Sequence, residues 1–148
     1  MKPGEENEVC ALVARVFNEF VASDFSPEGI AEFYRYAQPT AMVQRCKATN
    51  RVLVAEENDR IIGMLELKGF DHIAMLFVEI QGRGVGRELV EQALQICRQG
   101  GQAVQRVTVH ASQYAAPIYR KLGFEVEGNE QTENGITYLS MFFRFKTV

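Results

Sequence analysis

The sequence has no long hydrophobic run and no excess of positive charge. Its 148 residues include 16 Lys and Arg against 19 Asp and Glu, which gives a net charge of −3. A basic surface for nucleic acid is therefore not expected. A membrane-spanning helix needs roughly 18 consecutive apolar residues, and the sequence contains no such stretch. The first residues, MKPGEENEVCALVARVF, lack an apolar signal core. We expect a cytoplasmic protein with no membrane partner.

Cysteine, histidine and tryptophan are scarce as well. The sequence has no Trp, two His and three Cys, and the cysteines Cys10, Cys46 and Cys97 are far apart. An odd number of widely spaced cysteines forms neither a disulfide framework nor a CxxC metal pair, so reduced thiols are expected. The histidines and acidic residues also lack the spacing of metal ligands, and no metal site is predicted.

The composition is that of an ordinary globular protein, with 47% hydrophobic and 24% charged residues. Most domains contain roughly 100–150 residues, so the chain length fits one domain. No linker, internal repeat or low-complexity segment divides the sequence. We therefore predict a single domain over residues 1–148 that is built around one core.

Helical patterns dominate the N-terminal third. In the segment 8–21, apolar residues recur at spacings of three and four, as in an amphipathic helix. Ser26 followed by Pro27 is typical of a helix N-cap and first helical position. A second helix is therefore expected from this point until Pro39 interrupts it, and a third helical piece is expected over 42–46.

From residue 51 the apolar pattern changes to the alternation of strands. The segments 51–57, 61–68 and 72–79 are joined by tight turns, which predicts an antiparallel meander. The elements expected after the meander are a helix over 84–98 that Gly100-Gly101 ends, a strand over 103–111, a short helix over 113–122, and a strand pair over 124–128 and 136–145. This order predicts a mixed α/β fold.

The stretch LFVEIQGRGVGRELVEQA, residues 76–93, places three glycines between a strand and a helix. A helix N-terminus presents free N–H groups that bind phosphate, and glycines allow a close approach of the backbone. A dinucleotide fingerprint that begins at Gly82 would need glycine where Arg87 stands, and the GK[ST] of a Walker loop is missing. The spacing that remains is Gln81-x-x-Gly84-x-Gly86.

This spacing resembles the pyrophosphate loop of the GNAT superfamily of acyl-CoA-dependent N-acetyltransferases, which reads [QR]-x-x-G-x-[GA]. A second element, SQYAAPIYRKLGF at residues 112–124, also resembles the family, and the meander, loop and helix stand in the family's order. The resemblance covers nearly the whole chain. It implies a mostly antiparallel central sheet flanked by helices, with acetyl-CoA or coenzyme A as cosubstrate. It also implies transfer of the acetyl group to a primary amine of a small molecule or peptide, by direct attack in a ternary complex.

The resemblance assigns the cofactor-binding residues position by position. The backbone amides of the loop would hold the pyrophosphate, and Gln81 would shape the turn. The loop residues in question are Gly82, Arg83, Gly84, Val85 and Gly86, and Arg83 or Arg87 would add charged contacts.

Three further positions complete the cofactor site that the resemblance implies. Phe77 and Val78 match the place where the family's backbone binds the pantetheine arm and the acetyl carbonyl, and a fixed N–H there would stabilise the oxyanion. Ser112 stands where the family often has asparagine, and it would bond a pantetheine amide, directly or through water.

The catalytic roles come from the same comparison. Tyr119 matches the family's tyrosine that protonates the departing thiolate. His72 is a candidate general base, because in a regular strand it would share a face with Val78, whereas a bulge between them would break this parity. An exposed turn histidine is an equal alternative, and Glu66 and Glu79 are further candidates.

Several alternatives stay open. The connection from Val78 to Gln81 is short for the family, which favours a non-catalytic acyl-CoA-binding module as the alternative function. A nucleotide-binding protein is a weaker alternative, and a hydrolase built on His110 and Ser112 is disfavoured because no GxSxG elbow is present. The family's first strand is almost absent, and the oligomeric state stays open, a homodimer included. The residues expected to face the acceptor or the core are Phe17, Phe20, Phe25, Phe33, Tyr34 and Tyr36, with Asp24, Glu28 and Glu32 as acids.

Overall fold

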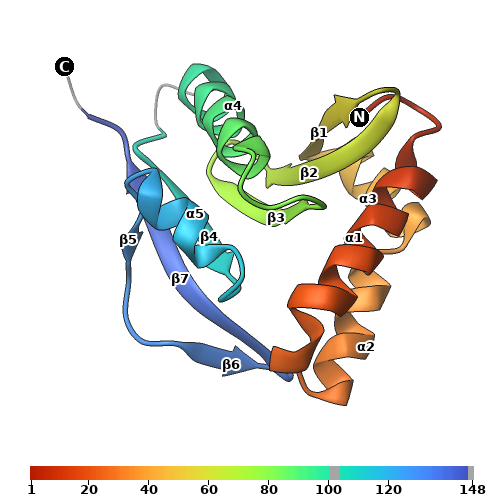
Figure 1. Ribbon diagram of the computed structural model, residues 1–148. Helices are drawn as coiled ribbons and strands as arrows, with labels where there is room; N and C mark the ends of the chain where they lie inside the picture. Colours follow the sequence, from red (N-terminus) through yellow and green to blue (C-terminus); the bar gives the residue numbers. More distant parts are fainter. Residues whose placement is uncertain (101–103, 147–148) are drawn as a thin grey trace.

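Figure 1 shows the computed structural model of the protein, in which residues 1–100 and 104–146 are described. The helices are α1 (Glu6–Phe20), the 3-10 turn η1 (Ala22–Asp24), α2 (Pro27–Tyr36), α3 (Pro39–Ala48), α4 (Val85–Gly100) and α5 (Ala116–Lys121). The strands are β1 (Asn50–Glu57), β2 (Arg60–Lys68), β3 (His72–Val78), β4 (Arg106–Ala111), β5 (Glu125–Val126), β6 (Gln131–Glu133) and β7 (Ile136–Arg144). The predicted mixed α/β fold is confirmed.

The strands form a sheet in the order β1-β2-β3-β4-β7-β5, and β6 pairs with β7. All neighbours are antiparallel except β3 and β4, which are parallel. Helices α1 to α3 cover one face of the first three strands, and α4 and α5 lie on the opposite face (Figure 1). At the β1 edge, the amino group of Met1 donates a hydrogen bond to the Val52 carbonyl oxygen at 2.6 Å.

The pairing between β3 and β4 is unusually short. Only His72 pairs with Thr108 and Ile73 with Val109, after which the two strands diverge (Figure 1). The backbone of β3 from Ala74 onward therefore has no partner strand on its β4 side. We call this gap between the two strands the β3–β4 opening.

A bulge at Ala74 changes the direction of the side chains in β3. Leu67 pairs with Ile73 and Glu66 with Met75, which leaves Ala74 without a partner on β2. A bulged residue reverses the alternation of side chains beyond it. His72 and Val78 therefore lie on opposite faces, and of the two arrangements that the sequence allows, the structure has the one with the bulge.

The core has two parts, one on each face of the sheet. Between the sheet and helices α4 and α5 lie Leu76 and Val78, among others. Between the sheet and helices α1 to α3 lie Met75 and Phe77, among others. Tyr114 packs against both parts at the edge of the β3–β4 opening. The last residues of β3 therefore face the two cores in turn.

Several predicted elements have the expected place and different limits. The Ser26 hydroxyl accepts a hydrogen bond from Gly29 N–H at 3.1 Å, which confirms the predicted N-cap of α2. Pro39 begins α3 as well as ending the α2 pattern, so the third helix is longer than predicted. The predicted helix 113–122 shortens to six residues, and β6 was not predicted. Helix α4 continues to Gly100, and Gly101 lies outside the described residues.

Two further observations concern the chain as a whole. In the described parts of the chain, no helix is both long and apolar enough to cross a membrane. The three cysteines are free thiols, and Cys10 and Cys97 are buried. Burial raises the pKa of each of these two thiols to about 11, which makes them unreactive at neutral pH.

Candidate active site

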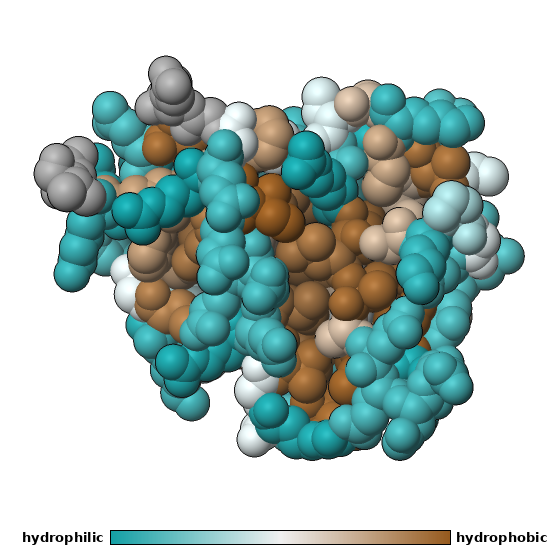
Figure 2. Space-filling view, turned by 90° about the horizontal axis from the view of Figure 1, so that it is seen from above, coloured by the Kyte–Doolittle hydropathy of each residue, from teal (hydrophilic) through white to brown (hydrophobic). Residues whose placement is uncertain are grey.

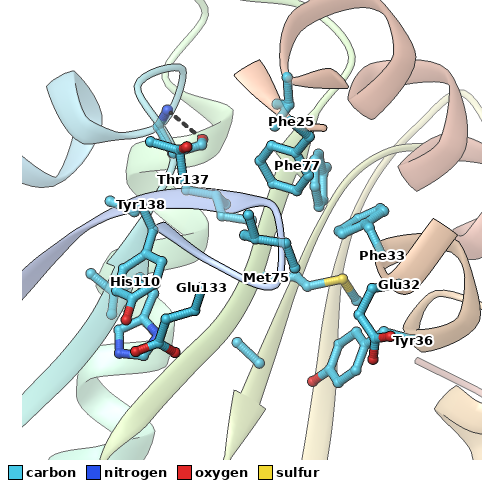
Figure 3. Close-up of a pocket in the computed structure, with 18 of the residues that line it drawn as sticks. Phe25, Glu32, Phe33, Tyr36, Met75, Phe77, His110, Glu133, Thr137 and Tyr138 are labelled. Carbon is cyan, nitrogen blue, oxygen red and sulfur yellow. Dashed lines mark hydrogen bonds between the residues drawn. The ribbon is translucent and has the colours of Figure 1, made fainter. Parts of the chain in front are cut away.

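A cavity of about 390 Å³, here the larger cavity, lies at the β3–β4 opening. Its walls come from β3, β4, α5, helix α2 with the segment leading into it, and the β6–β7 hairpin (Figure 3). Apolar side chains also line the bottom of a hollow framed by hydrophilic residues when the molecule is viewed from above (Figure 2). Residues far apart in the sequence thus enclose one apolar space.

A second cavity of about 270 Å³, the loop cavity, lies beside residues 80–87. Phe77 lines the larger cavity, and its neighbour Val78 lines the loop cavity. The end of β3 therefore separates the two spaces, because successive side chains of a strand point to opposite faces. An elongated ligand that passes through the β3–β4 opening would reach both.

The three glycines of the loop have two different physical roles. Gly82 and Gly84 have φ angles of +80° and +79°, in the left-handed region that side chains disfavour. Gly86 is in α4, where an added Cβ would lie 2.9 Å from the Ile118 side chain of α5. Two glycines thus allow the turn, and the third allows helices α4 and α5 to approach closely.

At the start of α4, backbone N–H groups have no hydrogen-bond acceptor within the helix. The first hydrogen bond of the helix runs from Glu88 N–H to the Gly84 carbonyl at 3.0 Å. The N–H groups of residues 85–87 therefore have no acceptor within the helix. Together with the positive end of the helix dipole, they form a place suited to an anion.

Two cations lie at the loop cavity, Arg87 and Lys121. Arg87 also forms an ion pair with Glu91 at 2.9 Å, one turn further along α4. Arg83 forms a two-pronged ion pair with Glu57 of β1 and does not line the cavity. Lys121 was not expected from the sequence, although it stands within the second family-like element.

Gln81 lies in the turn after β3. Its side-chain amide donates a hydrogen bond to the Val78 carbonyl oxygen at 3.0 Å. The Tyr114 hydroxyl donates to the same oxygen at 2.9 Å, across the β3–β4 opening. Burial raises the pKa of Tyr114, while the hydrogen bond that its hydroxyl accepts from the Gln81 amide acts in the opposite direction. Tyr114 is a site residue that sequence reasoning missed.

Tyr119 lines the larger cavity from α5 and is otherwise buried, with 1% of its surface exposed. Its ring packs against Phe124 at 5.0 Å between centroids. Burial raises the pKa of the phenol well above its ordinary value. Tyr119 thus keeps its proton at all ordinary pH values. Ser112 lines the same cavity, and its hydroxyl oxygen accepts a hydrogen bond from Ala115 N–H at 3.2 Å.

His72 lies in an adjacent space and does not line the larger cavity. It borders a hollow of about 310 Å³, the histidine hollow, together with Thr108 and His110. Its Nδ1 atom is 2.8 Å from the Thr108 hydroxyl oxygen. Burial is the main cause that lowers the pKa of His72, followed by the charges of His110 and Lys68, while Asp71 opposes them. His72 is therefore a neutral imidazole at neutral pH.

The two glutamates considered as bases lie elsewhere. Glu66 is fully buried and binds Arg45 through two hydrogen bonds of 2.7 and 3.0 Å, and Asn50 donates to it at 2.5 Å. One carboxylate oxygen of Glu79 pairs with Arg60 and lies 3.7 Å from Arg15. Neither glutamate lines the larger cavity. Both therefore have structural partners.

The polar residues that do line the larger cavity include two that sequence reasoning missed. His110 of β4 and Glu133 of β6 enter it from the side opposite to Glu32 of α2 (Figure 3). The alternation in VTVHA could have shown that His110 lies on the face of β4 opposite to Val109 and Ala111, which are buried. No signal pointed to Glu133, which lies in a short exposed strand.

The aromatic residues of the N-terminal helices divide between core and cavity. Phe25, Phe33 and Tyr36 line the larger cavity. Phe17 lies in the core, stacked on Phe33 at 3.9 Å. Phe20 is partly exposed and stacks on Tyr114. Among the described residues, no three His, Cys, Asp or Glu side chains gather as metal ligands.

Comparison with known proteins agrees with this geometry. Residues 21–145 match the family described as Acetyltransferase (GNAT) domain. The chain belongs to the GNAT acetyltransferase family. Membership of this GNAT family makes the protein an acyltransferase that depends on acetyl-CoA.

Two relatives of this GNAT protein occur in Escherichia coli. One is called uncharacterized N-acetyltransferase YafP and is 24% identical over 148 residues, which covers 98% of this chain and 92% of the relative. The other is called peptidyl-lysine N-acetyltransferase YjaB and is 31% identical over 84 residues, which covers 55% of this chain and 54% of the relative.

Solved structures share the fold over nearly the full length. A GCN5-related N-acetyltransferase from Rhodopseudomonas palustris has a TM-score of 0.82 at 24% identity, covering 98% of this chain and 92% of that protein. The PaiA N-acetyltransferase from Thermoplasma acidophilum, solved in complex with coenzyme A, has a TM-score of 0.80 at 16% identity, covering 98% of this chain and 96% of that protein. The predicted GNAT-like fold is thereby confirmed.

Proposed function

We propose that this protein transfers the acetyl group of acetyl-CoA to a primary amine of a small molecule or peptide, by direct attack in a ternary complex. The observation that carries this proposal is the pair of cavities that lie on either side of the end of β3, beside the β3–β4 opening. The glycine loop lies at one cavity, and Tyr119 lines the other. We also propose that residues 1–148 act as one domain and that the reaction takes place in the cytoplasm.

The glycine loop is the proposed site of the CoA pyrophosphate. The amides of Gly82, Arg83, Gly84, Val85 and Gly86 would bind its oxygens, because the free N–H groups and the helix dipole both favour an anion. Arg87 and Lys121 add positive charge at the same cavity. The pairing of Arg83 with Glu57 makes it a weaker candidate than Arg87.

The β3–β4 opening is the proposed path of the pantetheine arm. The unpaired edge of β3 at Phe77 and Val78 would bind it as a neighbouring strand does. The hydroxyl hydrogen of Ser112 is available to a pantetheine oxygen, because its oxygen is the atom that accepts from Ala115 N–H. A backbone N–H beside the acetyl carbonyl would then stabilise the tetrahedral oxyanion.

Tyr119 is the proposed general acid. It faces the larger cavity and stays protonated, since burial disfavours its anion. The departing CoA thiolate would form in the same apolar space, where burial raises its proton affinity too. Transfer of the phenolic proton to sulfur therefore does not depend on the low acidity that tyrosine has in water.

The acceptor is proposed to bind as a cation. The charged side chains that line the larger cavity are the carboxylates Glu32 and Glu133, and no Lys or Arg lies among its lining residues. Aromatic rings on the same walls, including Phe25, Phe33 and Phe77, favour an acceptor with an apolar body. Nucleic acid is not proposed as a partner.

The experiment is an assay of CoA thiol release with a panel of primary amines and peptides. The wild-type protein should release CoA with at least one amine class, and Tyr119→Phe should lower kcat about 100-fold or more. Binding of CoA, measured by calorimetry, should be unchanged in the variant. A wild-type protein that binds CoA and shows no turnover with any acceptor would be a non-catalytic acyl-CoA-binding module instead.

A further inference from the structure

His110 is the one imidazole that lines the larger cavity within the described residues. It is exposed and lies on the face of β4 opposite to the buried Val109 and Ala111. This face continues that of Phe77 in β3, which also lines the larger cavity. His110 borders the histidine hollow as well. His110 therefore borders both the larger cavity and the histidine hollow.

Aromatic neighbours hold the His110 ring in place. The ring stacks on Tyr138 of β7, with 4.2 Å between centroids and 18° between planes. On its other side, His72 meets it edge to face at 5.2 Å. Because two different strands supply these contacts, the direction of the His110 ring nitrogens is set by the sheet and not by the acceptor.

The orientation of His72 follows from its hydrogen bonds. The Thr108 hydroxyl donates to the Asp71 carbonyl oxygen at 3.2 Å. That hydroxyl has a single hydrogen, so at its contact with His72 the Nδ1–H must be the donor. His72 therefore presents its Nδ1–H to Thr108, which fixes the orientation of the ring that packs edge to face on His110.

We infer that His110 is the residue that takes the proton from the acceptor ammonium, and that His72 positions it. The inference rests on the proposed amine acetyltransferase function. The ammonium N–H bond breaks and an N–H bond forms on the His110 ring, after which the free amine attacks the acetyl carbon. The C–S bond then breaks. Two protons leave the amine nitrogen in all, one through His110 to water, while the second replaces the proton that Tyr119 gives to sulfur.

The charges around His110 suit this step. From the β6 side, Glu133 faces the Tyr138 hydroxyl and the cavity, and its carboxylate would stabilise the imidazolium once formed. From β4, Arg106 is paired with Glu127 at 3.3 Å, which offsets its charge. Lys68 and Asp71 lie near His72 with opposite signs. The histidine hollow gives the proton a way out of the site that avoids the acceptor.

The test uses two amines of the same shape, phenethylamine and β,β-difluorophenethylamine. Phenethylamine arrives as the ammonium and needs a base, whereas fluorination makes the second amine largely neutral at the assay pH. Replacement of His110 by glutamine, His110→Gln, should lower kcat/KM for phenethylamine about 100-fold. The value for the fluorinated amine should change less than about threefold, since no proton has to be removed before attack.

Two controls separate loss of the base from loss of folding, of cofactor binding or of ring positioning. CoA binding and the melting temperature of His110→Gln should match the wild type, and the rise of its kcat/KM with pH for phenethylamine should move up toward the pKa of the amine itself, because only the free amine can then attack. In His72→Gln, the loss should also be selective for phenethylamine but smaller than in His110→Gln, because His72 acts only through His110.

The possible outcomes distinguish the inference from the proposed function. Equal losses with both amines in His110→Gln would assign it to acceptor binding, and no loss would exclude it as the base. A selective loss in His72→Gln alone would make His72 the base instead. If the wild-type protein turns over neither amine, nor any other acceptor of the panel, the acetyltransferase function fails, and the role of His110 fails with it.

Discussion

At the scale of single residues, Ala74 determines which way the functional end of β3 faces. Without a bulge there, His72 and Val78 would share a face of the sheet, as strict alternation requires. The extra residue sends His72 toward His110 and the histidine hollow. A sequence reveals alternating positions but not the one residue that is skipped, because the bulge depends on pairing with β2. The general base therefore could not be identified from the sequence alone.

Tyr119 and the loop glycines differ from Ala74, because they stand within sequence motifs. Their local sequence already contains the reason for their conformation: Gly82 and Gly84 adopt positive φ angles, and Gly86 makes a close helix contact. Such requirements act over a few neighbouring residues, so a motif can express them. His110 and Glu133 come to line the same cavity only through the folded sheet, so no local pattern predicts that they share it.

The buried imidazole of His72 predicts a pH dependence of stability. Its folded-state pKa is lowered, so below about pH 6.5 the unfolded chain takes up a proton that the folded chain refuses. The stability is thus complete above about pH 7.5 and is lost as the pH falls toward the folded pKa. Between about pH 7.5 and 5.5, the melting temperature of the wild type should fall more steeply than that of His72→Gln. Equal slopes would mean that burial of His72 is not the source.

At the scale of elements, the β6–β7 hairpin closes the larger cavity through its contact with α2. Ser26 N–H donates to the Gly135 carbonyl at 3.0 Å, and a Cβ added at Gly29 would overlap that same carbonyl group. Gly135 itself has a φ of +78°. Two glycines therefore bring the hairpin turn against the N-terminus of α2, which sets the position of Glu133 and Tyr138.

Gly29→Ala tests this contact because helix propensity and packing predict opposite signs. In an ordinary helix the change stabilises by about 1 kcal/mol. Here the added methyl group would overlap the Gly135 carbonyl group, so the backbone of the hairpin turn would have to move. Overpacking of this kind lowers the free energy of unfolding by about 1–3 kcal/mol. We expect a net loss in the free energy of unfolding, measured in urea, and a lower kcat as the hairpin moves. The exposed Ala31→Gly in the same helix should cost about 1 kcal/mol by propensity alone and leave kcat unchanged. A more stable Gly29→Ala protein would contradict the proposed docking.

The elements that sequence patterns located well are those with a buried face. Helix α4 and strands β1 to β3 carry long apolar patterns and appeared where expected. Strand β6 has three exposed residues, and α5 has only six. Such short elements exist because longer neighbours hold them, so their own residues give a weak signal. Part of the cavity wall was therefore absent from the sequence prediction.

At the scale of the whole molecule, the sheet consists of two groups of strands that meet at the β3–β4 opening. Strands β1 to β3 form one group, and β4, β7, β5 and β6 form the other. Two residue pairs and the Tyr114 hydrogen bond to Val78 link them near the opening. The contacts across the opening, including that of Tyr114, depend on the final packing and could not be predicted from the sequence.

A ligand that lies between the two groups should stabilise their facing edges together. We expect CoA to slow amide hydrogen exchange in residues 74–78 of β3 and 110–111 of β4, besides residues 82–87 of the loop. Adenosine 3′,5′-bisphosphate carries no pantetheine arm and serves as the control. It should leave the strand edges exchanging as in the free protein, even where it binds. CoA that protects the loop and leaves both strand edges unchanged would exclude the β3–β4 opening as the path of the pantetheine arm. In that case the larger cavity would have to receive the acetyl group by another route.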